Sequence, residues 1–347
     1  MSSSASPNTS ASHGLRAVWR RRGALAWALW PVSLLYGGLQ QLNSRRYRAG
    51  SHRVEQADVP VIVVGNVIAG GAGKTPITMA VVAHLQARGL HPGIISRGYG
   101  RATSDCREAL ASSPASEVGD EPALLARSTG VPVFVAAKRI EAARALRARY
   151  PQVDVIVSDD GLQHGALARD IELCVFNDEG VGNGYLLPAG PLREPWPRPV
   201  TAALYAGQPP KPPGSAPAFA IERQLAATAH NARGEQMPLS ALRGQPVEAV
   251  AAVARPESFF SMLAERDIEL AATQALPDHY DFASFQPKLN GLKPLICTEK
   301  DAVKLWRTHP EAWAVPLQVS LPPAFWQLLD TKLQAALAQH RTARVTA

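Results

Sequence analysis

From residue 51 onward, apolar runs of strand length alternate with stretches of helical periodicity. The first run, VPVIVVG, is followed by a Gly-rich turn and by the amphipathic stretch TPITMAVVAHLQARG. Further apolar runs lie near Ile94, near Phe134, before Asp160 and near Val175, with helical stretches between most of them. This alternation predicts a parallel sheet with helices on both faces.

The second half of the chain begins a new α/β pattern after the Pro-rich connector 186–199, a strand near Ala203 and the loop GQPPKPPGSAP. Its strands are VEAVAAV, IELAATQ and PLICTEKD, with helices around Phe259 and at 302–306 and 328–339. A chain of 347 residues is long enough for two cores. We therefore expect a membrane-anchoring segment at 1–50, a parallel-sheet core domain at 51–205 and a smaller α/β domain at 206–347.

The segment ALAWALWPVSLLYGGL, from Ala24 to Leu39, is mostly apolar, contains Trp and Tyr, and has arginine clusters on both sides. This composition is typical of a segment at a membrane surface. As a helix it would extend only about 24 Å, short of a hydrocarbon core of roughly 30 Å, and Pro31 interrupts it. We favour a helix lying in one leaflet. The alternatives are a helix packed on the protein's own core and a signal peptide, although no Ala-x-Ala cleavage site follows Leu39.

The net charge of +7 comes entirely from this N-terminal region. Residues 1–50 contain no acidic residue and seven arginines: Arg16, Arg20, Arg21, Arg22, Arg45, Arg46 and Arg48. The rest of the chain has 29 basic and 29 acidic residues. It offers no basic domain for a nucleic acid, so we expect anionic membrane lipids, and no nucleic acid, as partners. Three widely spaced cysteines without zinc spacing fit a reduced cytosolic compartment.

The strongest chemical signal is GNVIAGGAGKTP, which lies between an apolar strand and an amphipathic helix. Glycines allow backbone N–H groups to turn towards phosphates, a lysine reaches the β and γ oxygens, and a following threonine holds Mg²⁺. The usual pattern has Gly where this chain has Ile68. We therefore predict an ATP phosphate loop formed by Ile68, Ala69, Gly70, Gly71, Ala72, Gly73, Lys74 and Thr75. The alternative without a function is a Gly-rich turn that happens to be followed by a lysine.

Acidic residues in two motifs are candidate metal ligands or bases. Asp159 and Asp160 end the apolar run VDVIVSDD, where the carboxyl end of a parallel strand places a Mg²⁺ carboxylate beside a phosphate loop. Paired acids after a strand also begin ordinary turns. In Gly119-Asp120-Glu121-Pro122, Asp120 is a candidate for the base that accepts a hydroxyl proton and Glu121 for the metal shell. Ordinary helix capping explains this motif equally well.

Other polar residues carry weaker signals. His279 lies in the polar turn PDHY of the second half. Arg193 and the loop SRGYGR are candidate phosphate or substrate contacts, because guanidinium groups bind phosphates bidentately, but both also fit surface loops. His164 follows the strand-end acids, and the segment CTEKD either faces the same cleft or caps the next helix.

Seven segments occur in an order that resembles the tetraacyldisaccharide 4'-kinases, the lipid A kinases of Gram-negative bacteria: GNVIAGGAGKTP, SRGYGR, GDEPALLA, SDDGLQH, LLPAGPLREP, PDHYDF and CTEKDAVKL. The resemblance extends from the N-terminal apolar segment to the last strands. In AAVARPESFF, Ala252 and Ala254 stand where the family usually has glycines.

The resemblance implies transfer of the ATP γ-phosphate to the 4'-hydroxyl of a tetraacylated glucosamine disaccharide 1-phosphate, at the cytoplasmic face of the inner membrane. It implies two α/β domains with a cleft between them. By matched position it makes Asp120 the base and His279 its partner. It assigns phosphate and metal contacts to Lys74, Thr75, Asp159 and Arg193. A phosphate-loop GTPase or ATPase switch is the alternative, but Asn-Lys-x-Asp is missing and Asp159-Asp160-Gly161 does not match Asp-x-x-Gly.

Overall fold

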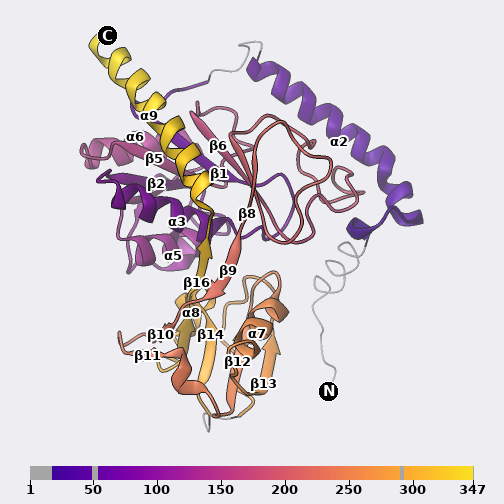
Figure 1. The fold of residues 1–347 in the computed structure, drawn as a ribbon, viewed down its shortest axis with the longest axis vertical. Coiled ribbons are helices and arrows are strands. Elements are labelled where there is room, and N and C mark those ends of the chain that lie inside the picture. Colours follow the sequence, from indigo (N-terminus) through magenta and orange to yellow (C-terminus); the bar gives the residue numbers. More distant parts are fainter. Residues whose placement is uncertain (1–17, 49–53, 290–292, 347) are drawn as a thin grey trace. The chain divides into compact units, whose positions relative to one another are not determined.

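The computed structural model describes residues 18–48, 54–289 and 293–346. Arg16, named above, lies outside this part. The chain forms two compact units, each assembled from separate segments (Figure 1). Unit 1 comprises Met1–Lys74, Val155–Ile221 and Leu321–Ala347, and unit 2 comprises Thr75–Asp154 and Glu222–Ser320. The linear division at 205/206 stays a prediction.

Unit 1 contains a parallel sheet. In spatial order its strands are β5 (Val155–Asp159), β1 (Val61–Gly65), β6 (Ile171–Phe176), β7 (Ala202–Tyr205) and β8 (Ala218–Ala220). β1 and β5 are buried along their whole length, as expected for continuous apolar runs in a parallel sheet. The register places Val64 opposite Asp159 and thereby brings the ends of these two strands together.

The last helix of unit 1 is longer than its sequence pattern predicted. α9 runs over Pro323–Thr346 and buries Phe325, Leu329 and Leu333 at helical spacing. Near its end, His340 Nε2 lies 3.2 Å from a carboxylate oxygen of Asp170, whose other oxygen accepts a hydrogen bond from the first amide of β1. This contact ties α9 to the start of β1 through Asp170.

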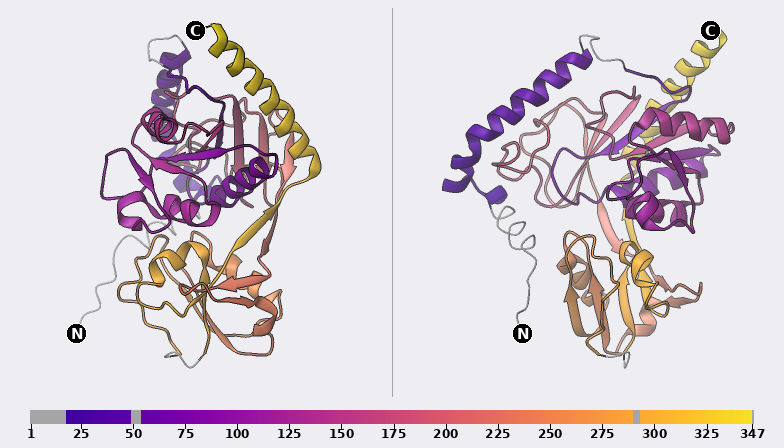
Figure 2. Two further views of the ribbon diagram at one scale, coloured as in Figure 1. Left: turned by 90° about the vertical axis from the view of Figure 1, so that its left-hand side faces the viewer. Right: turned by 180° about the vertical axis from the view of Figure 1, so that it is seen from behind.

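The N-terminal helix α2 covers Ala24–Arg48 and continues past Pro31. In Figures 1 and 2, α2 and α9 lie on different sides of the unit 1 strands. One face of α2 packs on the connector after β6. Ser33 Oγ donates to the carbonyl of Leu186 at 2.9 Å and accepts from the amide of Ala189 at 3.0 Å. Among the described helices, none combines the length and hydropathy needed to cross a bilayer.

The first part of unit 2 is a small α/β layer. Its elements are α3 (Lys74–Ala87, which begins in unit 1), β2 (Pro92–Ser96), β3 (Arg107–Ala109), α4 (Ala115–Val118), α5 (Asp120–Thr129), β4 (Val133–Val135) and α6 (Arg139–Arg149). β4 pairs parallel with β2 and antiparallel with β3. The three-residue β3 is a departure from the all-parallel expectation, and it is too short to give a periodic signal.

The second part of unit 2 has a mixed sheet in the order β11-β10-β15-β14-β12-β13. Its elements are β10 (Thr228–His230), β11 (Gln236–Pro238), the 3-10 helix η1 (Leu239–Leu242), β12 (Val247–Ala251), α7 (Pro256–Ala264), β13 (Leu270–Ala275), β14 (Leu295–Thr298), α8 (Glu299–Leu305) and β15 (Trp313–Val315). β13, β12, β14 and β15 are mutually parallel, whereas β10 and β11 form an antiparallel hairpin. A separate ribbon pairs β9 (Glu222–Leu225) with β16 (Leu317–Ser320).

Candidate active site

The predicted phosphate loop connects β1 to α3. β1 ends at Gly65, and α3 begins at Lys74. Gly70 and Gly73 have φ angles of 96° and 77°, a backbone region that side chains with a Cβ rarely adopt. The glycines therefore supply the conformational freedom that a tight loop at a helix N-terminus requires.

The first half of the loop is anchored to the protein. The side chain of Ile68 is buried, and the amide of Ala69 donates to the carbonyl of Pro191 at 2.7 Å. Asn177 Nδ2 donates to the carbonyl of Gly71 at 3.3 Å. Because the Ala69 N–H is used internally, the later loop amides and the N-terminus of α3 are better placed to bind phosphate. The phosphate-binding roles of Ile68 and Ala69 stay predictions.

Two cations of unit 1 meet at one strand-end carboxylate. Lys74 Nζ lies 3.6 Å from Asp160 Oδ1, and Arg193 Nη1 lies 3.5 Å from Asp160 Oδ2. The Lys74 side chain is almost fully buried, and Asp160 is held with a left-handed φ of 49° just after β5. The contacts are longer than charge-assisted hydrogen bonds, and the phosphate-binding roles of Lys74 and Arg193 stay predictions.

Backbone contacts fix the position of Arg193. Its amide donates to the carbonyl of Val67 at 2.7 Å, and its carbonyl accepts from Tyr36 OH of α2 at 2.9 Å. Arg193 is therefore held between the start of the phosphate loop and the N-terminal helix. The sequence prediction placed Arg193 in a Pro-rich connector, and the structure gives it this defined place in unit 1.

The carboxylates present fit Mg²⁺ bound together with a nucleotide. In the part of the chain that the structure describes, no three His, Cys, Asp or Glu side chains cluster as an all-protein metal cage. Mg²⁺ needs no such cage, because it is commonly held by one or two carboxylates and by substrate phosphates. Asp159 is buried at the end of β5, Asp160 follows it, and Thr75 is the second residue of α3. The metal role of Glu121 on α5 stays a prediction.

In unit 2, three polar groups meet at the start of α5. His279 Nδ1 lies 2.7 Å from Asp120 Oδ2, and Lys304 Nζ lies 2.6 Å from the same oxygen. His279 has a positive φ of 66°, and its amide donates to the carbonyl of Ala252 at 3.3 Å. The structure thus brings together the two residues that the resemblance paired, and their catalytic roles stay predictions.

The Asp120 carboxylate is held in its ionised form. Burial alone raises the pKa of Asp120, but the hydrogen bonds from His279 and Lys304 outweigh it, so that the pKa lies below its usual value. Lys304 is the residue that sequence reasoning missed. Its signal was present, since Lys304 belongs to the segment CTEKDAVKL that carried the family resemblance.

The SRGYGR loop lies directly against the start of α5. A Cβ on Gly119 would come within 3.0 Å of the Gly98 backbone, so both glycines are needed for this close approach. The ring of Tyr99 lies 6.2 Å from the His279 ring. The loop is therefore next to the Asp120 carboxylate, as a substrate contact would require.

The helix-capping interpretation holds for part of CTEKD. Thr298 Oγ1 accepts from the amide of Asp301 at 3.2 Å, and a carboxylate oxygen of Asp301 accepts from the amide of Ala252 at 3.0 Å. Cys297 is buried, and Glu299 accepts from Ser128. His164 is half-buried in unit 1, and its amide closes a turn on the carbonyl of Gly161.

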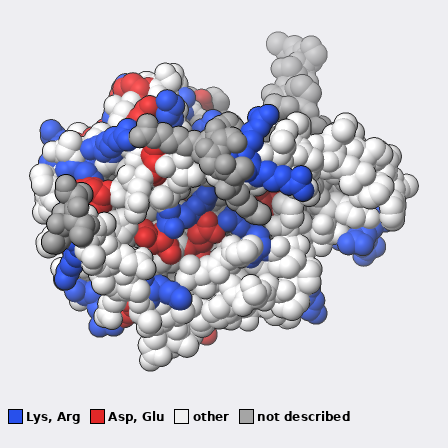
Figure 3. Space-filling model, turned by 90° about the horizontal axis from the view of Figure 1, so that it is seen from above, with Lys and Arg blue, Asp and Glu red and all other residues white. Residues whose placement is uncertain are grey.

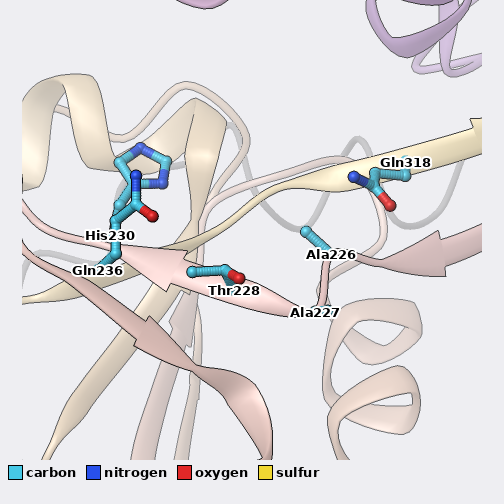
Figure 4. Close-up of a pocket in the computed structure, with 6 residues that line it drawn as sticks. All are labelled: Ala226, Ala227, Thr228, His230, Gln236 and Gln318. Atoms are coloured by element: carbon cyan, nitrogen blue, oxygen red, sulfur yellow. The ribbon is translucent and has the colours of Figure 1, made fainter.

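A hollow of about 350 Å³ elsewhere in unit 2 contains none of the predicted site residues. It is lined by Ala226, Ala227, Thr228, His230, Gln236 and Gln318. Figure 4 shows His230 and Gln236 at one end and Gln318 on β16 at the other. We assign no chemistry to it.

The site defines an α/β nucleotide-binding protein of the phosphate-loop class. Its parts are a strand, a Gly-rich loop, a helix that begins with lysine, and carboxylates at the end of the neighbouring parallel strand. Comparison with known proteins narrows this class. The family model for tetraacyldisaccharide-1-P 4'-kinase matches residues 25–334, so the chain belongs to that family.

Similar proteins agree with this assignment. A tetraacyldisaccharide 4'-kinase of Delftia acidovorans is 69% identical over 94% of this chain and 96% of its own length. Another from an Acidovorax species is 62% identical over 92% of this chain and 94% of its own length. The crystal structure of the "apo" form of LpxK from Aquifex aeolicus in complex with ATP has a TM-score of 0.76 and 27% identity, covering 89% of this chain and 99% of that one. The family and the α/β phosphate-loop fold predicted from the motifs are confirmed.

Proposed function

We propose that this chain is an ATP-dependent kinase that phosphorylates the 4'-hydroxyl of a tetraacylated glucosamine disaccharide 1-phosphate in lipid A biosynthesis. The observation that carries the proposal is the near full-length match to the tetraacyldisaccharide-1-P 4'-kinase family. The phosphate loop of unit 1 and the Asp120 cluster of unit 2 supply the two kinds of group that phosphoryl transfer needs.

ATP is the expected phosphoryl donor, because the similar structure from Aquifex aeolicus is a complex with ATP. Lys74 and Arg193 bring two positive charges to the phosphate loop, and the α3 N-terminus adds its partial positive charge. These charges stabilise the bound polyphosphate and the negative charge on the γ-phosphoryl group during its transfer.

Mg²⁺ is expected with the nucleotide. Thr75, Asp159 and Asp160 are the residues that would hold it, with Glu121 as a further candidate. The ion would neutralise charge on the phosphate oxygens when bound. Asp160 is in contact with Lys74 and Arg193, so this carboxylate also orients the two cations.

Asp120 is the expected proton acceptor. Its Oδ2 is engaged by His279 and Lys304, so we assign the substrate 4'-hydroxyl to Oδ1. The 4' oxygen forms a bond to the γ-phosphorus, the bond between that phosphorus and the β–γ bridging oxygen breaks, ADP leaves, and the hydroxyl proton passes to Asp120. His279 steadies the carboxylate through Nδ1.

The exposed face of α2 is the expected membrane contact, at the cytoplasmic face of the bacterial inner membrane. It exposes eight large apolar side chains: Leu25, Trp27, Trp30, Val32, Leu34, Leu35, Leu39 and Leu42. Exposed apolar area of this kind marks an interaction surface. The acyl chains of the substrate make a bilayer the natural place to meet it.

Anionic lipids would add an electrostatic contribution through the arginines. Arg20 is paired with Glu179 at 2.9 Å, and Arg22 donates to the carbonyl of Asn183 at 2.9 Å. Arg21, Arg45 and Arg46 are exposed and are the better candidates for lipid headgroups. On the face seen in Figure 3, Lys and Arg are interspersed with Asp and Glu.

The test measures phosphate transfer from γ-labelled ATP to a tetraacyldisaccharide 1-phosphate in mixed micelles, alongside release of inorganic phosphate. We expect labelled lipid and little free phosphate. A lipid without the 4'-hydroxyl is the control and should remain unlabelled. Release of phosphate without lipid labelling would favour the nucleotide-hydrolysing switch and would overturn the proposed function.

A further inference from the structure

Helix α2 contacts the backbone of Arg193 in addition to exposing an apolar face. Tyr36 OH donates to the Arg193 carbonyl at 2.9 Å. Gln40 Nε2, one turn further along the helix, donates to the same hydroxyl at 3.0 Å. Because the amide nitrogen of Gln40 only donates, the proton of the Tyr36 hydroxyl is left for the Arg193 carbonyl. Two side chains of α2 therefore form a directed chain of hydrogen bonds that ends on Arg193.

The position of Arg193 depends on contacts of this kind. Arg193 lies in the connector between β6 and β7, which the structure describes throughout and which contains neither helix nor strand. Its amide donates to the carbonyl of Val67 at 2.7 Å, and its carbonyl accepts from Tyr36. Its side chain is 30% exposed, and Nη1 lies 3.5 Å from Asp160 Oδ2. The backbone of Arg193 is thus fixed by both of its polar groups, while its side chain keeps access to solvent.

We infer that Tyr36 is a positioning residue for Arg193 at the nucleotide site. It fixes the backbone from which the Arg193 guanidinium reaches the polyphosphate, so that less conformational entropy is lost when the nucleotide binds. The inference rests on the proposed function, because it gives Tyr36 a part in holding the phosphoryl donor of that reaction. Tyr36 contacts no reacting atom and acts through Arg193. Helix α2 is then a part of the nucleotide site as well as the expected membrane contact.

Close packing of α2 on the connector gives this contact a defined geometry. A Cβ on Gly37 would come within 2.8 Å of Leu186 Cδ1, so a glycine is needed where the helix approaches the connector. Ser33 is buried one turn earlier and is hydrogen-bonded to the same connector. Tyr36 is half-buried, and a phenylalanine in its place keeps the ring. Removal of the hydroxyl therefore changes the hydrogen bonds at Arg193 and leaves the apolar face of α2 as it is.

The experiment compares the full-length wild type with Tyr36→Phe and Tyr185→Phe in detergent micelles. It measures the Kd for ATP by titration calorimetry and kcat/KM for ATP in the lipid kinase assay. Tyr36→Phe should weaken ATP binding and lower kcat/KM by about 2–10-fold, the range that the net contribution of one neutral hydrogen bond spans. Tyr185→Phe is the matched control and should behave as the wild type does. It removes another tyrosine hydroxyl from the same interface, where the Tyr185 ring packs on Trp27 of α2.

Two further measurements distinguish positioning from anchoring and from a general structural role. Sedimentation with phosphatidylglycerol-containing vesicles should be unchanged in Tyr36→Phe, and a loss of vesicle binding in place of ATP affinity would overturn the inference. In an Arg193→Ala background, Tyr36→Phe should cause no further loss of kcat/KM, because a residue that acts through the Arg193 side chain then has nothing to position. Losses that multiply would show that Tyr36 acts elsewhere and would also overturn it.

The outcomes separate this inference from the proposed function. If the wild type binds ATP but transfers no phosphate to the lipid, the proposed function fails, and the ATP titration still tests Tyr36. If the wild type transfers phosphate and folded Tyr36→Phe keeps the wild-type Kd and kcat/KM, only the positioning role fails. Gln40→Ala, which removes the donor to the hydroxyl, replaces Tyr36→Phe if the latter does not fold. If neither variant folds, Tyr36 is a structural residue and the positioning role is withdrawn.

Discussion

Two exposed leucines of α2 offer a quantitative test of membrane binding. Leu35 and Leu39 are 72% and 68% exposed, one turn apart on the same face of the helix. Truncation of each to Ala removes the apolar atoms without lowering helix propensity. The double variant Leu35→Ala/Leu39→Ala therefore changes the surface and leaves the packed face of α2 intact.

The expected loss follows from the apolar groups removed. A Leu→Ala change removes about three methylene equivalents, each worth about 0.8 kcal/mol on full burial. About two thirds of that amount is accessible to the bilayer at Leu35 and at Leu39, since the remainder is already covered by the protein. The double variant should lose about 3 kcal/mol, or about a hundredfold in vesicle partitioning.

Co-sedimentation with phosphatidylglycerol-containing vesicles measures this partitioning, and the unfolding temperature checks that the fold is kept. Leu110→Ala is the matched control, because Leu110 is 53% exposed and lies in unit 2, outside α2. It should bind vesicles as the wild type does. If the α2 double variant also bound as the wild type does, the membrane contact would lie elsewhere and the apolar face of α2 would need another explanation.

Three further predictions concern chemistry and salt. Lys74→Ala should lower kcat by about 10²–10³-fold at saturating ATP and Mg²⁺, because it removes a charge from the transferring phosphate; near-normal turnover would refute the loop assignment. Asp120→Asn and His279→Ala should each reduce kcat more than ATP affinity. The double variant should lose less kcat than the product of the two single losses, since paired groups act as a unit. Losses of kcat that multiply in this cycle would contradict the pairing of Asp120 with His279. Arg21→Gln should weaken binding to anionic vesicles by about 1 kcal/mol at low salt and by much less at high salt, whereas a salt-independent loss would contradict a headgroup contact.

The local pattern was sufficient to predict most of the parallel strands, though not β8 and β15, and the phosphate loop. β1 and β5 are continuous apolar runs that end in Gly65 and in Asp159, so their type and their chemistry could both be read from one short segment. The short strands β3 and β11 gave no such signal, because three residues cannot display a period. They form antiparallel edges that depend on tertiary pairing.

Two interpretations of the N-terminal sequence, packing on the protein's own core and exposure of an apolar face, each describe part of α2. The apolar run ends at Leu39, yet α2 continues to Arg48. Ala26 and Ser33 are buried on the protein, whereas Leu35 and Leu39 are exposed. Packing on the core and exposure of an apolar face occur on the same helix, and apolar content alone does not tell one face from the other.

The ion pair between Asp120 and Lys304 could not be predicted from the local sequence, because the two residues are 184 positions apart. The resemblance paired Asp120 with His279, and although Lys304 lies in the segment CTEKDAVKL that carried the resemblance, nothing in the sequence paired it with Asp120. Its importance comes from burial and distance, which are properties of the folded chain. The same reasoning explains why the contact between Tyr36 and Arg193 could not be predicted.

The segment Leu186–Arg193 connects the expected membrane helix to the phosphate loop within unit 1. At one end it is bonded to α2 through Ser33, and at the other Tyr36 OH donates to the carbonyl of Arg193. The same segment is hydrogen-bonded to the phosphate loop. The Pro191 carbonyl accepts from the Ala69 amide, and the Arg193 amide donates to the Val67 carbonyl. A helix held at a bilayer by its apolar face would thereby also fix the height of the phosphate loop above that bilayer. The Pro-rich composition of the segment suits this task, since proline restricts the backbone between the two sets of hydrogen bonds.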